Sequence, residues 1–430
     1  MDLIQQRTAI TIDEAISKVM EDEVCQPIET VDLMQSVNRI LAEDVVAIHP
    51  IPAFDRSLYD GYAIRAQDTD AVSKKAPINL EVIGEIGAGS VFTSTVHPGQ
   101  AVRIMTGAEM PASCNAVIML EGVTESTYGQ NRIAISQKVS IGERVFAKGS
   151  ELAEGTCIVA KGTQITPGVI GLLATFGFHQ VKVTKKPVVG VLATGSELLE
   201  IDEPLTQGKI RNSNAYMLLA QIEQAGGEAV YFGKLEDDLE TSVQVITEAI
   251  QQVDILITTG GVSVGDYDYM PAVYARLGAD ILFNKVAMRP GSVTTVAKCG
   301  NRYLFGLSGN PSASFIGFEL FVRPLLQKRL GSSTPYLFAS KAVLREAFPQ
   351  SNNFTQIVRT TCAFEQGQLH VTSNGLNMSS SVTSIAGAEA LAILRPTTTG
   401  YESGEVVDVL LLALQKGQSH SVFGGDSDAK

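Results

Sequence analysis

A glycine-rich loop that ends in two aspartates follows an apolar segment and has the chemistry of an anion site. Residues 255–259 read Ile-Leu-Ile-Thr-Thr, and residues 260–268 read Gly-Gly-Val-Ser-Val-Gly-Asp-Tyr-Asp. Glycines let backbone N–H groups come close to a phosphate, and the carboxylates of Asp266 and Asp268 are oxygen ligands of the kind that Mg²⁺ prefers. The same residues also fit an ordinary strand-to-helix turn with surface aspartates, so this loop alone leaves both interpretations open.

Two further loops of small polar residues also follow apolar runs. Residues 194–197 read Thr-Gly-Ser-Glu after the run at 188–193, and residues 308–311 read Ser-Gly-Asn-Pro after the run at 303–307. The first loop supplies a hydroxyl and a carboxylate, and the second opens a predicted helix whose N-terminus favours an anion. Three such loops at one edge of one sheet favour a phosphate or anion site, although small residues also permit tight turns.

Four charged residues lie between these loops in the sequence, and each could either bind a ligand or serve an ordinary structural purpose. Arg289 can clamp an oxyanion with two N–H groups and Lys285 can neutralise a phosphate, whereas a solvated surface pair is the alternative. Asp237 and Asp238 form an acidic turn that fits either a metal site or the cap of a predicted helix over 239–252.

Alternating strand and helix patterns predict that the three loops belong to one doubly wound, three-layer α/β domain over residues 185–332. The apolar runs that precede the loops have the composition of buried parallel strands. Helical spacing of apolar residues occurs over 214–225, 239–252, 269–278 and 314–330. Ligands in such sheets bind beyond the carboxyl ends of the strands, which is where the three loops fall.

The remaining segments predict a helix, two β-rich units and a tail. Residues 12–22 have helical spacing. Residues 50–140 alternate short β-rich runs with Gly and Pro turns, and residues 338–414 fit a small β-barrel or sandwich. Residues 416–430 are rich in Gly, Ser and Asp and predict a disordered tail.

The composition of the chain argues against several classes of protein. A formal charge of −13 argues against broad nucleic-acid binding, which needs a basic face. No apolar run reaches the about 20 residues that span a bilayer, and the N-terminus lacks the pattern of a secretory signal, so we expect a cytoplasmic protein without a membrane helix. The five cysteines lie too far apart to suggest a zinc site.

Several phrases of the sequence occur in the order seen in the MoeA family, which includes the C-terminal domain of gephyrin. They are residues 54–63, 103–108, 191–198, 259–266, 285–291 and 306–311. The chain resembles this family over nearly its whole length. The resemblance implies a molybdopterin molybdenumtransferase that inserts molybdate into adenylylated molybdopterin, with Mg²⁺ present, and releases AMP.

The resemblance also implies a homodimer of elongated four-domain subunits. Residues 1–49 with 141–184 would form an elongated linking domain, 50–140 a β-rich inserted domain, 185–332 a MogA-like molybdopterin-binding domain, and 338–414 a C-terminal β-barrel. Each active site would lie in a cleft between the MogA-like domain of one subunit and the inserted domain of the other. A MogA-type adenylyltransferase and molybdoenzymes are the protein partners that this function suggests.

Carried over to this sequence, the family's motifs assign the following roles. The catalytic set is Asp60, Thr106, Glu197, Asp266 and Asp268. The metal ligands are drawn from Glu197, Asp237, Asp238, Asp266 and Asp268. The pterin-binding set is Thr194, Gly195, Ser213, Asn214, Gly260, Gly261, Ser263, Lys285, Arg289, Ser308 and Asn310.

The molybdate site is the part of this assignment in which the sequence departs most from the family. Ser292 stands where lysine is frequent, and Ala313 falls near a frequent serine. Arg359 and Ser379 in the last domain are weaker candidates for the same site.

Two other functions remain as alternatives. The α/β domain alone resembles the MogA-type domain that adenylylates molybdopterin and the related domain of CinA proteins, but the β-rich parts at 50–140 and 338–414 argue against that activity. A non-catalytic, gephyrin-like scaffold is the second alternative, and the presence of the acidic residues argues against it.

Overall fold

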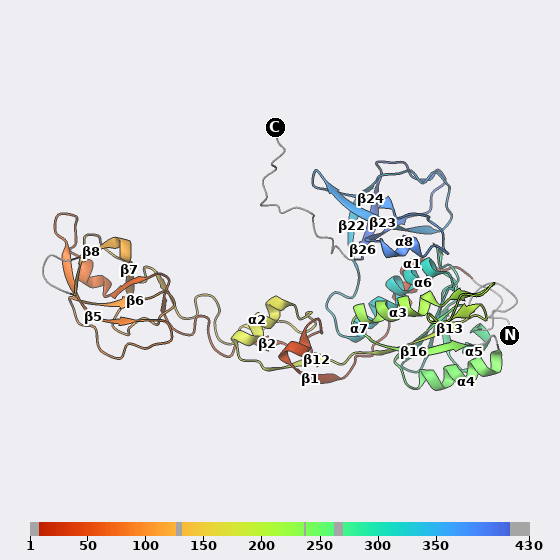
Figure 1. Ribbon diagram of the computed structural model, residues 1–430, viewed down its shortest axis with the longest axis horizontal. Helices are drawn as coiled ribbons and strands as arrows, with labels where there is room; N and C mark the ends of the chain where they lie inside the picture. The colour runs from red at the N-terminus through yellow and green to blue at the C-terminus, as the bar shows by residue number, and fades with distance from the viewer. Residues whose placement is uncertain (1–7, 126–130, 236–237, 262–269, 413–430) are drawn as a thin grey trace. The chain divides into compact units, whose positions relative to one another are not determined.

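The chain forms two compact units, and each is described by itself. The insert unit comprises Glu43–Ala160 and Pro167–His179, and the main unit comprises Met1–Ala42, Lys161–Thr166 and Gln180–Lys430. Figure 1 shows their secondary structure in the computed structural model. The structure describes residues 8–125, 131–235, 238–261 and 270–412.

A mostly parallel six-stranded sheet forms the centre of the main unit. Its strands follow the order β16–β13–β17–β21–β20–β18, and neighbours are parallel except in the two pairs that β20 makes. The runs predicted as buried strands are confirmed as β13, β17 and β21. The bounds are β13 (Val188–Thr194), β16 (Glu228–Leu235), β17 (Ile255–Thr259), β18 (Asp280–Phe283), β20 (Thr295–Cys299) and β21 (Arg302–Leu307).

Helices cover both faces of this sheet. Val189 and Val191 of β13 pack in one core with α1, α3, α6 and α7, whereas Leu192 packs in a second core with α4 and α5. Successive residues of a strand point to opposite faces, so this division follows from the strand itself. The predicted three-layer α/β fold is confirmed. The helices are α1 (Ile12–Met20), α3 (Ser213–Gln224), α4 (Leu239–Ile250), α5 (Met270–Arg276), α6 (Pro311–Gly317) and α7 (Arg323–Arg329).

The single helix predicted over 314–330 is wrong in one respect. The segment is α-helical at both ends, but Phe318–Val322 between α6 and α7 forms a π-helical turn. Pro324 stands at the start of α7. Proline has no N–H and crowds the preceding turn, so the regular α-helical ladder is interrupted in front of it.

A buried ion pair fixes the N-terminal helix α1 to the α/β domain. Asp22, just beyond α1, and Arg329, the last residue of α7, are both 0% exposed. Arg329 Nε donates to Asp22 Oδ2 at 2.8 Å, and Lys298 Nζ lies 3.5 Å from Asp22 Oδ1. The two other guanidinium nitrogens donate to the carbonyls of Asp254 and Asn301. The charge of Arg329 is therefore balanced within the fold.

A closed five-stranded barrel follows the α/β domain. β23 pairs with both β24 and β25, and the chain of pairs β24–β22–β26–β25 completes the closure, which confirms the predicted C-terminal β-barrel. The short strand β19 of the α/β domain also pairs with β23. The bounds are β19 (Met288–Arg289), β22 (Phe338–Leu344), β23 (Thr355–Glu365), β24 (Gln368–Ser373), α8 (Thr383–Ala386), β25 (Ala390–Leu394) and β26 (Val406–Leu411).

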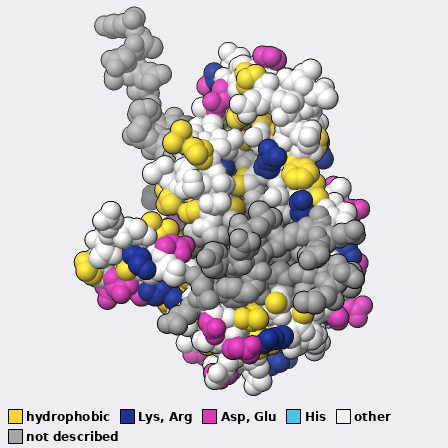
Figure 2. Space-filling view, turned by 90° about the vertical axis from the view of Figure 1, so that its right-hand side faces the viewer, with side chains coloured by type: hydrophobic (Ala, Val, Ile, Leu, Met, Phe, Trp, Pro, Cys, Tyr) yellow, Lys and Arg dark blue, Asp and Glu magenta, His cyan; other side chains and the backbone are white. Residues whose placement is uncertain are grey.

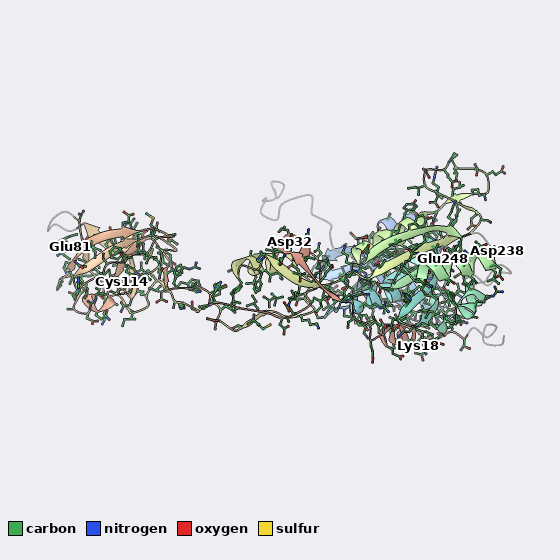
Figure 3. All side chains as sticks on the ribbon, turned by 90° about the horizontal axis from the view of Figure 1, so that it is seen from below. Lys18, Asp32, Glu81, Cys114, Asp238 and Glu248 are labelled. Atoms are coloured by element: carbon green, nitrogen blue, oxygen red, sulfur yellow. The ribbon has the colours of Figure 1, made fainter. Side chains whose placement is uncertain are left out.

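The insert unit contains a second six-stranded sheet, in the order β7–β4–β6–β5–β9–β8. Two apolar cores pack on this sheet, so the predicted β-rich character of the segment is confirmed. Cys114 lies inside this unit (Figure 3), and burial raises the pKa of its thiol to about 12. The bounds are β4 (Gly61–Ile64), β5 (Ile78–Ile86), β6 (Gln100–Ile104), β7 (Ala116–Met119), β8 (Val123–Glu125) and β9 (Arg132–Ile135).

Short antiparallel pairs complete the two units. In the main unit β1 pairs with β12, and in the insert unit β2 pairs with β11 and β3 with β10. The predicted extents of the four domains remain predictions, and the tail over 416–430 lies outside the described residues. The bounds are β1 (Ile28–Asp32), β2 (Val45–Val46), β3 (Arg56–Ser57), β10 (Val145–Phe146), β11 (Cys157–Val159), α2 (Pro167–Thr175) and β12 (Gln180–Thr184).

Charged side chains are dispersed over the face of the molecule that Figure 2 shows. Lys and Arg lie singly or in small groups, with Asp and Glu among them. Within the described part of the chain, no helix combines the length and the apolar character needed to cross a membrane.

Candidate active site

The carboxyl ends of β13, β17 and β21 bring the predicted loops together at one edge of the sheet. The N–H of Gly260 donates to the carbonyl of Leu307 at 3.0 Å, and the Thr259 hydroxyl donates to the carbonyl of Ser308 at 3.3 Å. A Cβ atom on Gly260 would lie 2.4 Å from the carbonyl oxygen of Thr194, and its φ is +96°. Only glycine permits so close an approach. The described residues of the three loops, which include Gly260 and Gly261 of the second loop, therefore meet at the strand ends, as predicted.

Asn214, in the first turn of α3, links two of these loops. Its Nδ2 donates to Thr259 Oγ1 at 3.1 Å and to the carbonyl of Gly309 at 2.8 Å. Its Oδ1 is buried and accepts no hydrogen bond from the described residues. Buried acceptors are normally paired, so this oxygen is available to an N–H donor of a ligand. Ser213, which was predicted with it, is exposed at the first position of the same helix.

Glu197 holds its carboxylate over the first of the loops. A Cβ atom on Gly195 would lie 2.5 Å from Glu197 Oε2, which places the carboxylate directly against the Gly195 backbone. The side chain is exposed and forms no ion pair with a described cation. Lys209 and Lys234 instead donate to backbone carbonyls of the same loop. Glu197 thus presents at the strand ends a carboxylate that no described cation neutralises.

The other acidic residues predicted for a metal site are only partly described. Asp238 lies at the start of α4 (Figure 3), and its Oδ2 accepts a hydrogen bond from the N–H of Thr241 at 2.7 Å. Hydrogen bonds from the side chain and backbone of Thr241 hold the pKa of Asp238 below its usual value. The capping interpretation of Asp238 is confirmed, and its metal-binding role stays a prediction. The predicted site residues that lie outside the described residues are Asp237, Ser263, Asp266 and Asp268.

A pocket of about 350 Å³ lies between the α/β domain and the β-barrel of the main unit. We call it the interdomain pocket. The barrel is held against α6 beside it, because Ser312 Oγ donates to the carbonyl of Ser381 at 2.8 Å and the N–H of Ser312 donates to the carbonyl of Ser379 at 3.1 Å. The pocket is lined by Arg289, Pro290, Gly291, Ser292, Val293, Ser308, Asn310, Ala313, Gln356, Arg359, Asn377 and Ser379.

The most unusual side chain in this lining is Arg359, which is 1% exposed. Its Nε and Nη2 both donate to Ser384 Oγ, at 3.2 and 3.0 Å, and its Nη1 donates to Asn377 Oδ1 at 3.1 Å. Nη2 also donates to the carbonyls of Leu376 and Met378. All of these acceptors are neutral, and among the described carboxylates none forms an ion pair with Arg359.

Among the residues that the structure describes, the charge of Arg359 has no counter-ion. Burial lowers the pKa of its guanidinium, because a low-dielectric surrounding disfavours the charged form. A guanidinium has five N–H donors, and one N–H of Nη1 has no acceptor among the described residues. A buried charge is normally paired. The pocket therefore offers an anion both a positive charge and an N–H donor.

Arg289 adds a second cation to the pocket. It is exposed, and its guanidinium carbon lies 5.8 Å from the centre of the Phe354 ring. No described carboxylate forms an ion pair with it. Lys285, which was predicted with Arg289, is half-buried, and its backbone carbonyl accepts from the N–H of Ile10 at 3.1 Å. Lys285 is absent from the lining of the pocket as described, so only one of the two predicted cations lies there.

The structure brings together residues that are far apart in the sequence, and it adds some that sequence reasoning missed. Ser292, Ala313, Arg359 and Ser379, which were considered for the molybdate site, all line the interdomain pocket. Gln356 and Asn377 line the pocket as well. Ser384 is not part of the lining, but its Oγ accepts hydrogen bonds from Arg359. No local motif marks these three residues. A lone arginine within the β-rich run 355–363 was the signal that could have directed attention to this strand.

Asp60 and Thr106 form a separate hydrogen-bonded pair in the insert unit. The N–H and hydroxyl of Thr106 both donate to Asp60 Oδ1, at 2.7 and 2.8 Å. These bonds, with a smaller contribution from the charge of Arg103, hold the pKa of Asp60 below its usual value. Both residues are exposed. Two residues that the sequence assigned to the same catalytic set are thus hydrogen-bonded to each other, and their catalytic role stays a prediction.

Three family models match successive parts of the chain. Residues 10–177 match the MoeA N-terminal region, domains I and II. Residues 190–328, which contain the loops at the strand ends, match a probable molybdopterin binding domain. Residues 341–412 match the MoeA C-terminal region, domain IV.

Curated and solved relatives agree with these matches over nearly the full length. The chain is 49% identical to a molybdopterin molybdenumtransferase of Bacillus subtilis, over 96% of this chain and 97% of the relative. It is 44% identical to one of Staphylococcus epidermidis, over 95% and 97%. The crystal structure of the molybdopterin biosynthesis moeA protein from Pyrococcus horikoshii superimposes with a TM-score of 0.81 at 31% identity, covering 94% of this chain and 100% of that one. The resemblance seen in the sequence is confirmed, and the chain belongs to the MoeA family.

Proposed function

We propose that the chain is a molybdopterin molybdenumtransferase, which inserts molybdate into adenylylated molybdopterin and releases AMP. Relatives at 44% to 49% identity carry the name of this activity. The observation that carries the proposal is the buried, uncompensated guanidinium of Arg359 in a pocket that shares Ser308 with the strand-end loops. These observations support a model in which the oxyanion would bind in the interdomain pocket and the phosphate-bearing pterin at the strand-end loops, next to each other in one unit.

The interdomain pocket fits molybdate by charge and by donors. Molybdate is a tetrahedral dianion, and the free N–H of Arg359 and the guanidinium of Arg289 offer two positive charges. The side chains of Ser292, Asn377 and Ser379 line the same pocket and can donate to the remaining oxygens. Cations placed before the reaction offset the repulsion between the oxyanion and the phosphate of the pterin.

The strand-end loops fit the pterin substrate. Gly260 keeps the backbone close to Thr194, which leaves an edge without side-chain bulk for a phosphate. Asn214 Oδ1, which has no donor among the described residues, would accept a hydrogen bond from a ring N–H. Because Ser308 and Asn310 belong both to the third loop and to the interdomain pocket, a pterin held here would present its reacting end to the oxyanion.

Mg²⁺ is part of the proposal, and Glu197 is the described residue that would hold it. Within the described ranges, no group of three or more His, Cys, Asp or Glu side chains is arranged around a metal position. Mg²⁺ keeps several waters and is usually held by one or two carboxylates together with substrate phosphates, so the single uncompensated carboxylate of Glu197 fits. When bound, the ion would polarise the phosphoanhydride of the adenylate.

We further propose that Asp60 and Thr106 complete the site from the insert unit of a second subunit. Exposed apolar side chains surround this pair in the sequence of the insert unit: Phe54, Leu58, Tyr59 and Met105 are 41% to 47% exposed. Apolar side chains grouped in this way favour a contact surface over a solvated one. The proposal thus includes a cytoplasmic homodimer, with a MogA-type adenylyltransferase supplying its substrate.

The test is assembly of molybdenum cofactor from purified components. The chain is incubated with adenylylated molybdopterin, molybdate and Mg²⁺, and AMP release and active cofactor are measured together. We expect Glu197→Ala and Asp60→Ala to lose both products and Glu248→Ala, an exposed carboxylate on α4 (Figure 3), to keep them.

Three outcomes would contradict the proposal, the first in this assay, the second in a companion incubation with molybdopterin and ATP, and the third in a search for binding partners. Full activity in both site variants would remove the assigned residues from the mechanism. Formation of adenylylated molybdopterin from molybdopterin and ATP, without cofactor assembly, would instead assign a MogA-like adenylyltransferase. A stable protein partner without either activity would assign a scaffold.

A further inference from the structure

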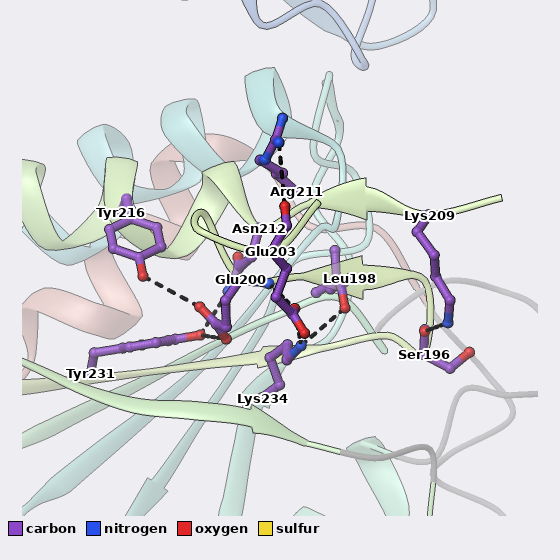
Figure 4. Close-up of polar contacts among 10 residues, drawn as sticks. All are labelled: Ser196, Leu198, Glu200, Glu203, Lys209, Arg211, Asn212, Tyr216, Tyr231 and Lys234. Atoms are coloured by element: carbon purple, nitrogen blue, oxygen red, sulfur yellow. Dashed lines mark hydrogen bonds and ion pairs between the residues drawn. The ribbon is translucent and has the colours of Figure 1, made fainter. Parts of the chain in front are cut away.

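The loop that carries Glu197 is held by side chains from the neighbouring edge strand β16. Figure 4 shows the contacts. Within this loop β14 (Leu198–Leu199) and β15 (Ile210–Arg211) pair in parallel, and the N–H of Ile210 donates to the carbonyl of Glu197 at 3.0 Å. The backbone of Glu197 is therefore part of a small folded element, whose position decides where the Glu197 carboxylate lies.

Tyr231 of β16 is at the centre of these contacts. Its hydroxyl donates to Glu200 Oε1 at 2.9 Å and accepts from Asn212 Nδ2 at 2.8 Å. Lys234 of the same strand donates to the carbonyl of Leu198 at 3.1 Å. Tyr231 is half-buried, and burial together with the Glu200 carboxylate raises the pKa of its phenol, so the hydroxyl keeps the proton that it donates.

A β-bulge explains how one strand presents both side chains to the loop. In the pairing with β13, Val191 lies opposite Tyr231 and Ala193 opposite Lys234, so β16 contains one residue more than its partner. Residues three apart in a regular strand point to opposite faces, and an inserted residue brings them to the same face. Gly233, with a φ of +89°, supplies the left-handed conformation within this bulge.

Asn212 extends the network from the loop to the helix that carries Asn214. It is 1% exposed, and its Oδ1 accepts from the N–H of Ala215 at 3.2 Å as the cap of α3. Its backbone N–H donates to the carbonyl of Leu199 at 2.8 Å. One amide side chain thus joins the start of α3 to Tyr231, and through Tyr231 to Glu200 in the Glu197 loop.

We propose that Tyr231 is a positioning residue: through Glu200 and Asn212 it fixes the loop of Glu197 relative to the site residue Asn214. The inference rests on the proposed function, in which Glu197 holds Mg²⁺. Tyr216 provides the internal comparison, because its exposed hydroxyl reaches the other oxygen of Glu200 at 3.3 Å and contacts no other residue of this network through a hydrogen bond shown in Figure 4.

The test compares Tyr231→Phe with Tyr216→Phe in the full chain. The first readout is amide hydrogen exchange at Ile210, whose N–H binds the carbonyl of Glu197. We expect this exchange to become about tenfold faster in Tyr231→Phe, since a hydrogen bond to a charged group is lost, and to stay unchanged in Tyr216→Phe. Exchange at Gly260, which belongs to a different loop, stays unchanged in both variants.

The second readout is the Mg²⁺ concentration that gives half-maximal AMP release. We expect it to rise about tenfold in Tyr231→Phe, with little change in maximal rate, because Mg²⁺ recovers the loop position when it binds Glu197. Glu200→Gln, which keeps the size of the side chain but loses its charge, would show a smaller rise in the same direction. If Tyr231→Phe fails to fold, Glu200→Gln takes its place as the test variant in both readouts.

The outcomes separate this inference from the proposed function. Equal Ile210 exchange in wild type and Tyr231→Phe, or equal changes in both tyrosine variants, would overturn the positioning role. Faster exchange with full AMP release in Glu197→Ala would support the positioning of the loop and contradict the proposed role of Glu197.

Discussion

Two buried arginines of the main unit, Arg329 and Arg359, differ in what balances their charge. Arg329 is 0% exposed, and its Nε lies 2.8 Å from a carboxylate oxygen of Asp22. Arg359 is 1% exposed, but its acceptors are Ser384 Oγ, an amide oxygen and backbone carbonyls. A buried charge that is paired inside the fold has its counter-ion already and depends on it, whereas a charge that lacks a carboxylate partner among the described residues can pair with an anionic ligand.

The two arginines also differ in their surroundings, because one lies in a packed contact between elements and the other lines a pocket. Arg329 lies at the end of α7 with Lys298 also near Asp22, and it holds α1 against the sheet. Arg359 lines a pocket of about 350 Å³ that opens beside the strand-end loops. Substitution of each residue therefore tests a different property of the chain.

The largest expected effect is on stability, from Arg329→Met. Removing this guanidinium leaves Asp22 buried with Lys298, at 3.5 Å, as its one remaining cation among the described residues, and breaking a buried pair costs about 3 to 5 kcal/mol. We expect the free energy of unfolding, measured in urea, to fall by that amount. Activity per folded molecule should not change. Loss of molybdate binding in the folded fraction would mean that the two arginines are not separate in function.

The next effect is on activity, from Arg359→Met. Removal of one preorganised donor from a site costs about 10²-fold to 10³-fold in rate, so we expect cofactor assembly to fall by at least that factor. Met also removes the donors to Ser384, Asn377 and the carbonyls of Leu376 and Met378, so we expect the midpoint of thermal unfolding to fall, and the rate is therefore compared per folded molecule. Arg395→Met, which replaces an exposed barrel arginine, is the control and should keep full activity.

A gain of function is expected from Ser292→Lys. The resemblance to the family places a frequent lysine at this position, and Ser292 lines the pocket with Arg289 and Arg359. A third cation beside a dianion should strengthen molybdate binding by about 1 kcal/mol, or roughly fivefold. Isothermal titration at two salt concentrations measures it, and the gain should shrink at high salt. Unchanged or weaker binding would indicate that the ligand lies away from Ser292.

The smallest effect is on the titration of Asp60 in Thr106→Val. Hydrogen bonds from Thr106 keep the pKa of Asp60 below its usual value of about 3.9, so their loss should raise the pKa toward that value. Because the folded-state pKa is depressed, the stabilisation is present above the usual value and is lost as pH falls through the folded-state pKa. Carbon NMR of the Asp60 carboxyl group reports the shift. Thr106→Ser, which keeps the hydroxyl, should retain the low pKa.

The fold followed from the sequence wherever local pattern decides structure. The apolar runs before Thr194, Gly260 and Ser308 are buried on both faces, so composition and length were enough to predict parallel strands. The sequence predicted one regular helix over 314–330, whereas the structure has a π-helical turn at Phe318–Val322. The spacing of apolar residues does not reveal such an interruption in front of Pro324. Tyr231 and Lys234 point to the same face of the sheet because a β-bulge lies between them. The regular alternation of side chains along a strand would place them on opposite faces, so the sequence pattern did not predict this.

The candidate site was predictable in part. Residues in glycine-rich loops were found because glycines mark close approach of the backbone, as at Gly260. Gln356 and Asn377 were missed because they reach the pocket through the pairing of β19 with β23 and through the loop around Arg359, and such long-range pairing leaves no local motif. Lys285 was grouped with Arg289 by their spacing, but of these two residues only Arg289 lines the described pocket, and the pterin-binding role of Lys285 stays a prediction.

The most direct test of the central claim is equilibrium binding of molybdate to wild type, Arg359→Met and Arg329→Met, measured by isothermal titration at one salt concentration. The account predicts that Arg359→Met binds molybdate at least about tenfold more weakly than wild type, while the folded Arg329→Met variant binds it as wild type does. Equal affinity in wild type and Arg359→Met would contradict the claim that the uncompensated charge of Arg359 is held for the oxyanion.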